Sequence, residues 1–227
     1  MVNLVLKDIL MMKKTLLLCL IYPFVFIFAF QDSEVAAISA SIIGVTYILV
    51  LSACAYDDKY KADVLLNSLP VGRSVIVLSK YLSIYMFFAI GLLFYMAACT
   101  LLSVSGIPIK THSLTIESVV AALGAVTFMN SIYFPVFFKL GYVKSRMVNF
   151  ILFFSVFLSV NQLAALIRRY IINSMDTAAN GNIIMSVVKF FASLSGIQAA
   201  LAAAVIMLII VSISYSISLR FYKNREF

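Results

Sequence analysis

The sequence predicts an all-α membrane protein with six transmembrane helices. Of the 227 residues, 64% are hydrophobic and 11% are charged, whereas soluble domains are about 45–50% apolar and about 25% charged. Long uncharged stretches recur, and a helix needs about 20 apolar residues to cross the hydrocarbon core. Barrel strands would instead alternate over about ten residues. The composition therefore excludes a water-soluble enzyme, a disordered chain and a disulfide scaffold.

Six stretches are long and apolar enough to span a membrane. The first follows Lys13 and Lys14 and resembles a signal-peptide core, but no small-residue cleavage site follows it, so we expect a retained helix. Pro23 and Pro135 fall inside the first and fourth spans, where neighbouring helices can satisfy the freed carbonyls. Few residues lie between the spans, so we expect residues 1–227 to form one transmembrane domain. The predicted spans cover residues 15–31, 35–56, 80–104, 113–138, 147–167 and 196–219.

Two shorter segments accompany the spans. Residues 1–14 place Val5 and Ile9 on one helical face and Lys7 on another, a pattern typical of a helix in the plane of the membrane interface. Residues 183–195 run apolar over too short a stretch to span. We expect them to form an outer interfacial or re-entrant helix. It would serve either as an outer gate or as a lid over the last two spans.

The basic residues predict that both termini are cytoplasmic. With the N-terminus inside, thirteen of the seventeen Lys and Arg residues fall in cytoplasmic segments, the bias that sets orientation. The net charge of +8 therefore reflects topology and contact with anionic lipid, and we expect no nucleic-acid partner. The four outer basic residues are Lys110, Arg168, Arg169 and Lys189.

Motifs for catalysis or nucleotide binding are absent from the sequence. No Gly-x-x-x-x-Gly-Lys-Ser/Thr run occurs, and His112 is the single histidine. No carboxylate pair lies within a predicted span, and no charge lies near the middle of one, where ion-coupled transporters usually carry them. We therefore expect no enzyme activity in this chain, and any transport must draw its energy from a partner protein. We interpret Cys19, Cys54 and Cys99 as packing residues.

The loop between the second and third spans is the most informative stretch. Residues 57–69 predict a short amphipathic helix that begins at two acidic residues and ends before Pro70 and Gly72. Lys59, Asp63 and Asn67 share its polar face. The helix either rests on the lipid surface as a connector or docks a cytosolic partner. Its apolar residues follow the i, i+3, i+4, i+7 pattern: Ala62, Leu65, Leu66 and Leu69.

This loop resembles that of small bacterial ABC-2 type permeases. The resemblance rests on the string Leu-Leu-Asn-Ser-Leu-Pro-Val-Gly-Arg-Ser-x-Ile-Val-x-Ser-Lys-Tyr-Leu at 65–82, preceded by Asp-Asp-Lys. The N-terminal Leu-Val-Leu-Lys-Asp-Ile-Leu and the six-helix layout are similar to the same family. The resemblance covers essentially the whole chain.

The resemblance implies a permease subunit of an ATP-driven exporter in the bacterial cytoplasmic membrane. Such permeases pair with a second permease copy or paralogue, and separate cytosolic ABC ATPase subunits bind ATP and Mg. Some small members export amphipathic peptides, such as phenol-soluble modulins, or antimicrobial peptides. Residues 1–14 would form an elbow helix and residues 57–69 the coupling helix. The implied docking residues are Asp57, Asp58, Lys59, Tyr60, Asp63, Val64 and Asn67.

Polar side chains inside two predicted spans leave two interpretations open. Asn130 and Ser131 lie in the fourth span, and Asn161 and Gln162 near the outer end of the fifth. They either hydrogen-bond to neighbouring helices or line a translocation path. At the level of the whole chain, the alternative function is a membrane immunity or sensor protein that binds a partner without transporting.

Overall fold

A computed structural model describes residues 2–31, 34–68, 70, 72–105, 114–173 and 196–224. These residues form helices joined by short turns and contain no strand, which confirms the all-α class. The predicted outer helix at 183–195 and the loop that carries His112 lie outside the described residues. The helices are α1 (Val2–Met11), α2 (Lys13–Cys19), α3 (Tyr22–Ala29), α4 (Glu34–Lys59), α5 (Ala62–Ser68), α6 (Arg73–Val104), α7 (Ile116–Leu140), α8 (Tyr142–Asn173) and α10 (Gly196–Lys223).

Four of these helices are long and apolar enough to cross a membrane. They contain the candidate spans Ala36–Lys59, Arg73–Val104, Ser118–Leu140 and Leu201–Lys223. A bent pair, Asn3–Met11 and Lys13–Ala29, raises the number to five if it counts as one span. The predicted span 147–167 lies within α8, most of whose side chains beyond Leu158 are not described. The total of six spans therefore stays a prediction.

The N-terminal segment differs from the single predicted span at 15–31. The chain bends by 68° where α1 meets α2, close to the predicted boundary at residue 14. Helix α2 then ends at Cys19, and α3 begins at Tyr22 with Pro23 in its first turn. A proline ring clashes with the carbonyl four residues earlier, here that of Cys19, and this explains the break between the two helices.

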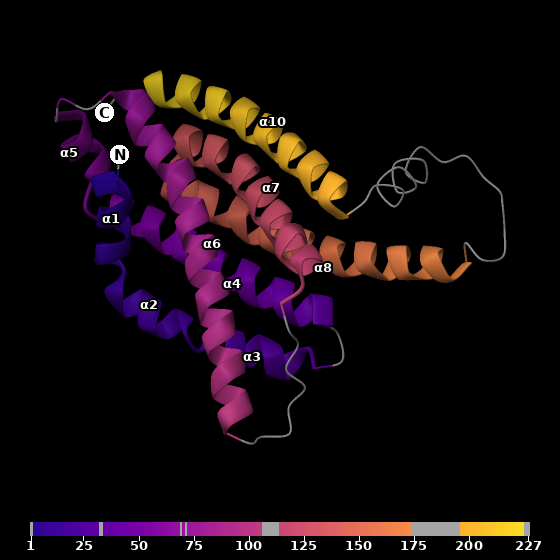
Figure 1. The fold of residues 1–227 in the computed structure, drawn as a ribbon. Coiled ribbons are helices and arrows are strands. Elements are labelled where there is room, and N and C mark those ends of the chain that lie inside the picture. Colours follow the sequence, from indigo (N-terminus) through magenta and orange to yellow (C-terminus); the bar gives the residue numbers. More distant parts are fainter. Residues whose placement is uncertain are drawn as a thin grey trace.

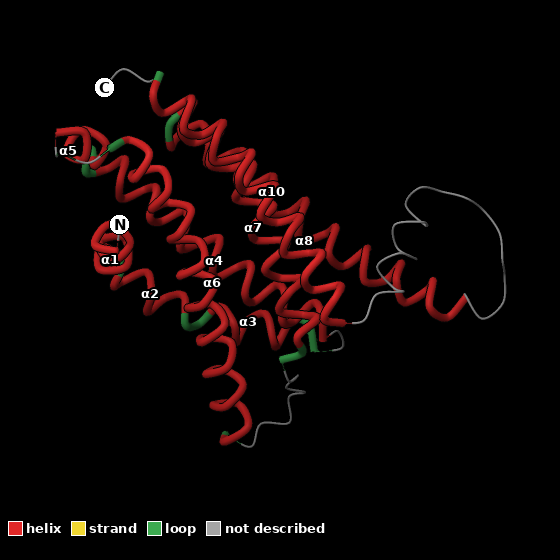
Figure 2. Tube along the Cα trace, turned by 45° about the horizontal axis from the view of Figure 1, so that its top comes forward, coloured by secondary structure: helices red, strands yellow, loops and turns green. Residues whose placement is uncertain are grey.

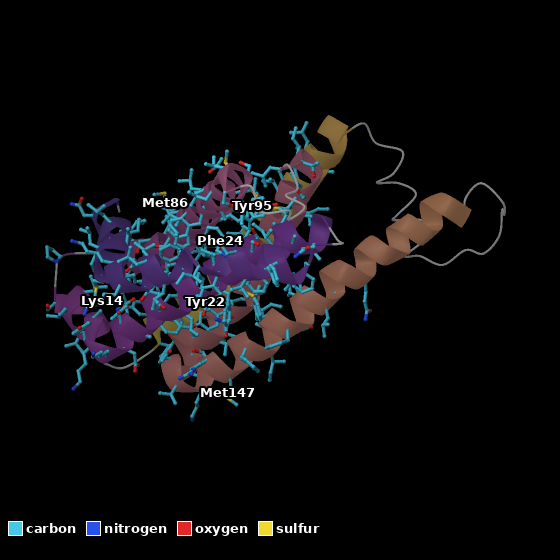
Figure 3. The ribbon with its side chains drawn as sticks, turned by 90° about the horizontal axis from the view of Figure 1, so that it is seen from below. Lys14, Tyr22, Phe24, Met86, Tyr95 and Met147 are labelled. Atoms are coloured by element: carbon cyan, nitrogen blue, oxygen red, sulfur yellow. The ribbon has the colours of Figure 1, made fainter. Side chains whose placement is uncertain are left out.

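Helix α4 lies at the centre of the bundle. It contacts α1, α2, α3, α5, α6, α7 and α8, and 78% of its most apolar stretch is buried, against 11% for α10. Small residues allow this close packing: a Cβ added at Gly91 of α6 would lie 3.4 Å from the carbonyl oxygen of Ile42 in α4. Figure 1 shows α10 and α8 at the outside of the bundle. Lys14, Met86 and Met147 lie at the periphery, whereas Tyr95 is 1% exposed (Figure 3).

A proline inside α7 connects three helices. Pro135 has no N–H to donate to the carbonyl of Ser131, one turn earlier. That carbonyl accepts a hydrogen bond from Ser214 Oγ of α10 at 2.6 Å. Ser214 Oγ lies 2.5 Å from Tyr81 Oη of α6, which is also 2.9 Å from Ser218 Oγ. A neighbouring helix thus satisfies the freed carbonyl, as the sequence predicts for a proline in a span.

Both described ends of the chain lie at one end of the bundle, which we call the termini end (Figures 1 and 2). Arg73 Nη1, at the start of α6, donates to the carbonyl of Lys223 in the last turn of α10 at 2.7 Å. Lys139, near the end of α7, lies over the ring of Phe221 in α10, with its Nζ 5.2 Å from the ring centroid. The termini end therefore carries the end of α4, α5, the start of α6 and the α7–α8 turn.

Candidate functional site

The predicted helix 57–69 is not one helix in the structure. Residues up to Lys59 belong to α4, and the chain then turns at Tyr60 and Lys61 before α5 begins at Ala62. Lys61 has a left-handed backbone, with φ of 49°. The amide N–H groups of Tyr60 and Lys61 donate to carbonyls of the last turn of α4. The third predicted span likewise begins earlier than residue 80, because α6 starts at Arg73 directly after Gly72.

Only part of the predicted apolar face of the loop helix is buried. Ala62 is 7% exposed and Leu66 is 8% exposed, and α5 contacts α4. Leu65 is 63% exposed, so it does not share the packing of Ala62 and Leu66 within the chain. Ala62 and Leu66 are spaced four apart, so they lie one above the other on the side of this seven-residue helix that packs on its neighbour. Leu65 lies to one side of the line through these two residues. Leu69 lies outside the described residues.

An exposed corner remains at the turn between α4 and α5. Tyr60 is 53% exposed and Val64 is 55% exposed, beside the exposed Leu65. The Tyr60 ring stacks on Tyr56 at 6.2 Å between centroids, and Lys59 Nζ lies 5.5 Å from the Tyr60 centroid. We use "exposed corner" for the exposed residues Asp58, Lys59, Tyr60, Val64 and Leu65. Asp63 and Asn67 belong to α5, and their side chains are not described.

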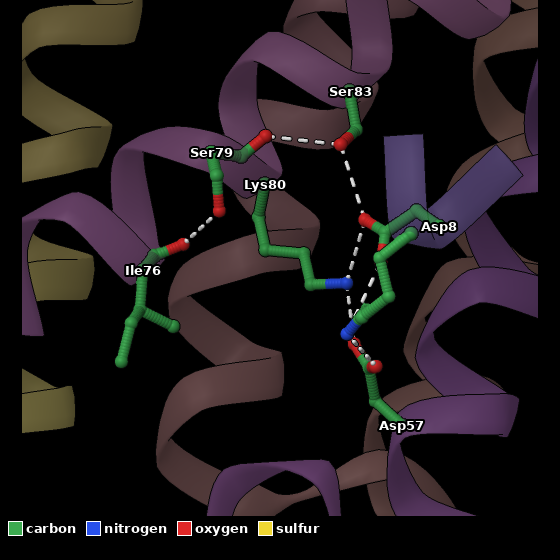
Figure 4. A network of polar contacts seen from close by, with 7 residues as sticks. Asp8, Asp57, Ile76, Ser79, Lys80 and Ser83 are labelled. Carbon is green, nitrogen blue, oxygen red and sulfur yellow. Dashed lines mark hydrogen bonds and ion pairs between the residues drawn. The ribbon is translucent and has the colours of Figure 1, made fainter. Parts of the chain in front are cut away.

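Asp57, which the sequence assigns to the docking set, is buried instead. It pairs with Lys80 of α6, and its Oδ1 lies 2.9 Å from Lys7 Nζ of α1. The last turn of α4 faces α1 and α6, so Asp57 points into this junction rather than toward solvent (Figure 4). Its side chain is 7% exposed. A partner that docks on the exposed corner would therefore not reach the Asp57 carboxylate in this conformation.

The pairing of Asp57 belongs to a closed arrangement of four charges, which we call the charge ring. Asp8 Oδ2 accepts hydrogen bonds from Lys80 Nζ at 2.9 Å and from Ser83 Oγ at 3.1 Å. Asp8 Oδ1 lies 3.4 Å from Lys7 Nζ. Each carboxylate thus faces both lysines, and the ring is neutral overall. Three of the four side chains are 4–8% exposed, and that of Lys7 is 29% exposed.

The sequence contains a signal for the charge ring that periodicity analysis of the apolar residues missed. Asp8 lies on the same helical stripe as Val5 and Met12, which are 9% and 0% exposed. A carboxylate on a buried stripe requires a cation partner, because a buried charge is stable only when it is paired. Lys80 lies two turns inside α6 and meets the same requirement from the other side.

The structure does not bring the four candidate path residues together. Asn130 is 0% exposed and its Nδ2 donates to the carbonyl of Val126 at 2.8 Å. Ser131 is 7% exposed, whereas Gln162 of α8 is exposed and the Asn161 side chain is not described. Gln162 also lies about ten residues farther from the turn at Gly141 than Asn130 does, or ~15 Å along a helix axis.

Some buried polar atoms in the described parts of α7 and α8 have no hydrogen-bond partner, and two of the residues that carry them, Thr127 and Asn149, were not singled out by the sequence analysis. Among the described residues, Thr127 Oγ1, Asn130 Oδ1 and both amide atoms of Asn149 have no hydrogen-bond partner. Ordered water commonly satisfies such groups inside proteins. No group of three or more His, Cys, Asp or Glu side chains that could hold a metal occurs in the described part of the chain.

Comparison with known families adds one finding. The family model described as "ABC-2 family transporter protein" matches residues 3–223, nearly the whole chain. No curated protein matches the chain, and no solved structure does.

Proposed function

The chain belongs to the ABC-2 family of transporter proteins, and we propose that it is the transmembrane permease subunit of an ATP-driven exporter. Permeases of this family normally work with an ATPase subunit. In this proposal, cytosolic ABC ATPase subunits bind ATP and Mg and supply the energy. The permease itself contributes the membrane path and the surface on which those subunits dock.

The main structural support for this proposal is the exposed corner. It combines two exposed apolar side chains, Tyr60 and Val64, with charged neighbours at the termini end of the bundle. Exposed apolar side chains framed by polar ones are typical of docking surfaces. The backbone behind them is supported, because α5 packs on α4 through Ala62 and Leu66. We propose Asp58, Lys59, Tyr60, Asp63, Val64 and Asn67 as the docking residues.

We propose that both termini and the exposed corner face the cytoplasm. Exposed basic residues gather at the termini end, among them Lys13, Lys14, Lys59, Lys61 and Arg73. The positive-inside rule places such an end in the cytoplasm. The two acidic residues of the charge ring are neutralised internally, so this end presents a largely basic surface to anionic lipid headgroups and to the ATPase.

The proposed cargo is an amphipathic or antimicrobial peptide, on the basis of the resemblance in size and layout to small peptide exporters. The active form would contain two permease copies, or this chain and a paralogue. Of the four residues proposed to line a path, Gln162 has an exposed side chain, while Asn130 and Ser131 are buried within one chain. A path along those two would therefore run through the bundle rather than between copies.

The experiment replaces the apolar side chains of the exposed corner by charge. The variants Tyr60→Glu and Val64→Glu are co-expressed with a candidate ABC ATPase subunit, and Leu140→Glu, also exposed at the termini end, is the control. We expect ATPase association to fall about thirtyfold, as for loss of about 2 kcal/mol at a docking hot spot, and export to fall with it.

Membrane level of the two corner variants should stay at the wild-type value, because Tyr60 and Val64 lie outside the candidate spans. The purified permease alone should hydrolyse no ATP. If association and export equal the wild-type values in both corner variants, the corner is only a connector. In that case the alternative, a non-transporting immunity or sensor protein, is favoured.

A further inference from the structure

The charge ring joins three elements that are far apart in the sequence. Lys7 and Asp8 come from α1, Asp57 from the last turn of α4, and Lys80 from the second turn of α6. Helices α4 and α6 are the two flanks of the loop that carries α5. The ring therefore connects the N-terminal helix to both flanks of the candidate docking loop, as Figure 4 shows.

The pairing pattern makes the three elements mutually dependent. The Asp57 carboxylate faces Lys7 of α1 and Lys80 of α6, and the Asp8 carboxylate faces Lys80 as well. If α1 or either flank moves alone, at least one largely buried charge loses a partner, and an unpaired buried charge is strongly unfavourable. Motion of the three elements as one unit keeps every pair.

The charge ring fixes the relative position of α1, α4 and α6 in a way that apolar contacts do not. Well-packed apolar residues often stabilise a buried junction as well as an ion pair does. Apolar contacts tolerate sliding, whereas a carboxylate with two ammonium partners and the Ser83 hydroxyl holds a definite position. The exposed corner begins directly after Asp57, since α4 continues only to Lys59. A displacement of the corner thus reaches the ring through less than one helical turn.

We propose that the charge ring locks α1 to both flanks of the α5 loop, so that a displacement of the exposed corner moves α1, α4 and α6 as one body. The displacement then passes through the 68° bend after α1 to α2 and α3. This inference rests on the proposed function for the source of the displacement, namely a docked ATPase. The lock itself is a property of the chain alone and can be tested without the ATPase.

The first experiment measures distances within the purified chain. Nitroxide labels at Leu10→Cys in α1 and Ser68→Cys in α5 report the lock, and labels at Met147→Cys and Leu208→Cys report the α8–α10 region as a reference. The three native cysteines are first replaced by alanine. Pulsed electron resonance gives the distance distribution of each pair.

The decisive variants reverse charges in two steps. The double reversal Asp57→Lys with Lys80→Asp keeps the ion pair between α4 and α6 but opposes like charges across the contacts to α1. Adding Lys7→Asp and Asp8→Lys reverses the whole ring and restores every pair. We expect the α1–α5 distribution to broaden at least twofold in the double reversal and to narrow again in the fourfold one. The reference pair should be unchanged throughout.

A narrow α1–α5 distribution in a folded double reversal would overturn the proposal. If the double reversal does not fold, Lys80→Met and Lys80→Arg replace it, with the exposed Lys144→Met as control. The methionine variant should broaden the distribution and the arginine variant should not; equal widths in the two would overturn the proposal as well.

The second experiment separates the lock from the proposed function. In complex with the ATPase, the double reversal should keep ATPase association, because the exposed corner is intact, and lose most permease-dependent stimulation of hydrolysis. The fourfold reversal should restore it. Unchanged stimulation in the double reversal would show that the ring does not transmit the displacement. If the wild-type chain binds no ATPase while the distance results hold, the proposed function fails and the lock stands.

Discussion

At the scale of single residues, two kinds of polar group decide how this apolar chain packs. Charged groups are neutralised in a ring at the termini end, and one backbone carbonyl freed by Pro135 is satisfied by Ser214. Both follow from the same rule, that a buried polar group needs a partner. The sequence reveals the need in each case but does not identify the partner, since Ser214 lies 83 residues from Ser131.

The hydrogen bond to the carbonyl of Ser131 can be tested by one substitution that removes the donor and a second that compensates for its loss. Replacing Ser214→Ala removes its donor, and we expect a loss of about 1–3 kcal/mol in the free energy of unfolding. Adding Pro135→Ala supplies an N–H in α7 itself and should recover most of that loss. The control is Ser212→Ala, whose hydroxyl bonds within its own helix to Leu208. Unfolding of the purified chain in detergent measures all four proteins; equal stability of Ser214→Ala and Ser212→Ala would contradict the assignment.

At the scale of elements, hydropathy predicted the helices better than their ends. Helix α4 extends past both ends of its predicted span, α6 begins before its span and α10 ends after its span, each into charged sequence. The reason is that hydropathy marks the apolar part of a helix and not its hydrogen bonding. The division of residues 57–69 was not predictable by periodicity, because Lys61 adopts a left-handed backbone without being glycine. Because of that turn, Asp57 lies in the last turn of the buried helix α4 instead of at the start of an exposed helix.

Periodicity could predict one part of the candidate site, the exposed corner, but not the charge ring beside it. Tyr60 and Val64 lie exposed, and the position of the corner follows from the apolar pair Ala62 and Leu66 on α5. The charge ring depends on contacts of α1 with α4 and α6, between residues 50 and 72 positions apart. No local pattern specifies such pairs.

The close approach of α4 and α6 gives a prediction at this scale. A Cβ at Gly91 would meet the carbonyl of Ile42 at 3.4 Å, an ordinary contact, so Gly91→Ala should be nearly neutral. Gly91→Leu adds atoms beyond that contact and should destabilise the protein by about 1–3 kcal/mol through overpacking. Thermal unfolding of the two variants tests the contact, and a leucine variant as stable as the alanine variant would show that the helices do not pack this closely.

At the scale of the whole molecule, the composition was sufficient to predict the fold class. The distribution of Lys and Arg was the basis for the proposed orientation in the membrane. The apolar excess predicted a helical membrane protein, and the family match supports a transporter subunit. The structure adds that both described ends of the chain lie at one end of the bundle. The proposed six crossings would produce this arrangement, because an even number returns the chain to its starting side.

Accessibility labelling tests the orientation in intact cells. In a chain without its native cysteines, Ser33→Cys is expected to react with an impermeant thiol reagent added outside, whereas Ser74→Cys is expected to react only after the membrane is opened. The reason is the bias of Lys and Arg toward the cytoplasmic side. The reverse labelling pattern would place the exposed corner outside the cell and remove the proposed docking role.

Site-specific photo-crosslinking detects directly whether an ATPase subunit docks on the exposed corner. A photoreactive amino acid is placed at Tyr60 or Val64, and at Leu140 as the control exposed at the same end of the bundle. We expect crosslinks to the co-expressed ATPase from the first two positions and none from the third. Crosslinks from Leu140 alone, or from none of the three positions in a complex that co-purifies, would contradict it.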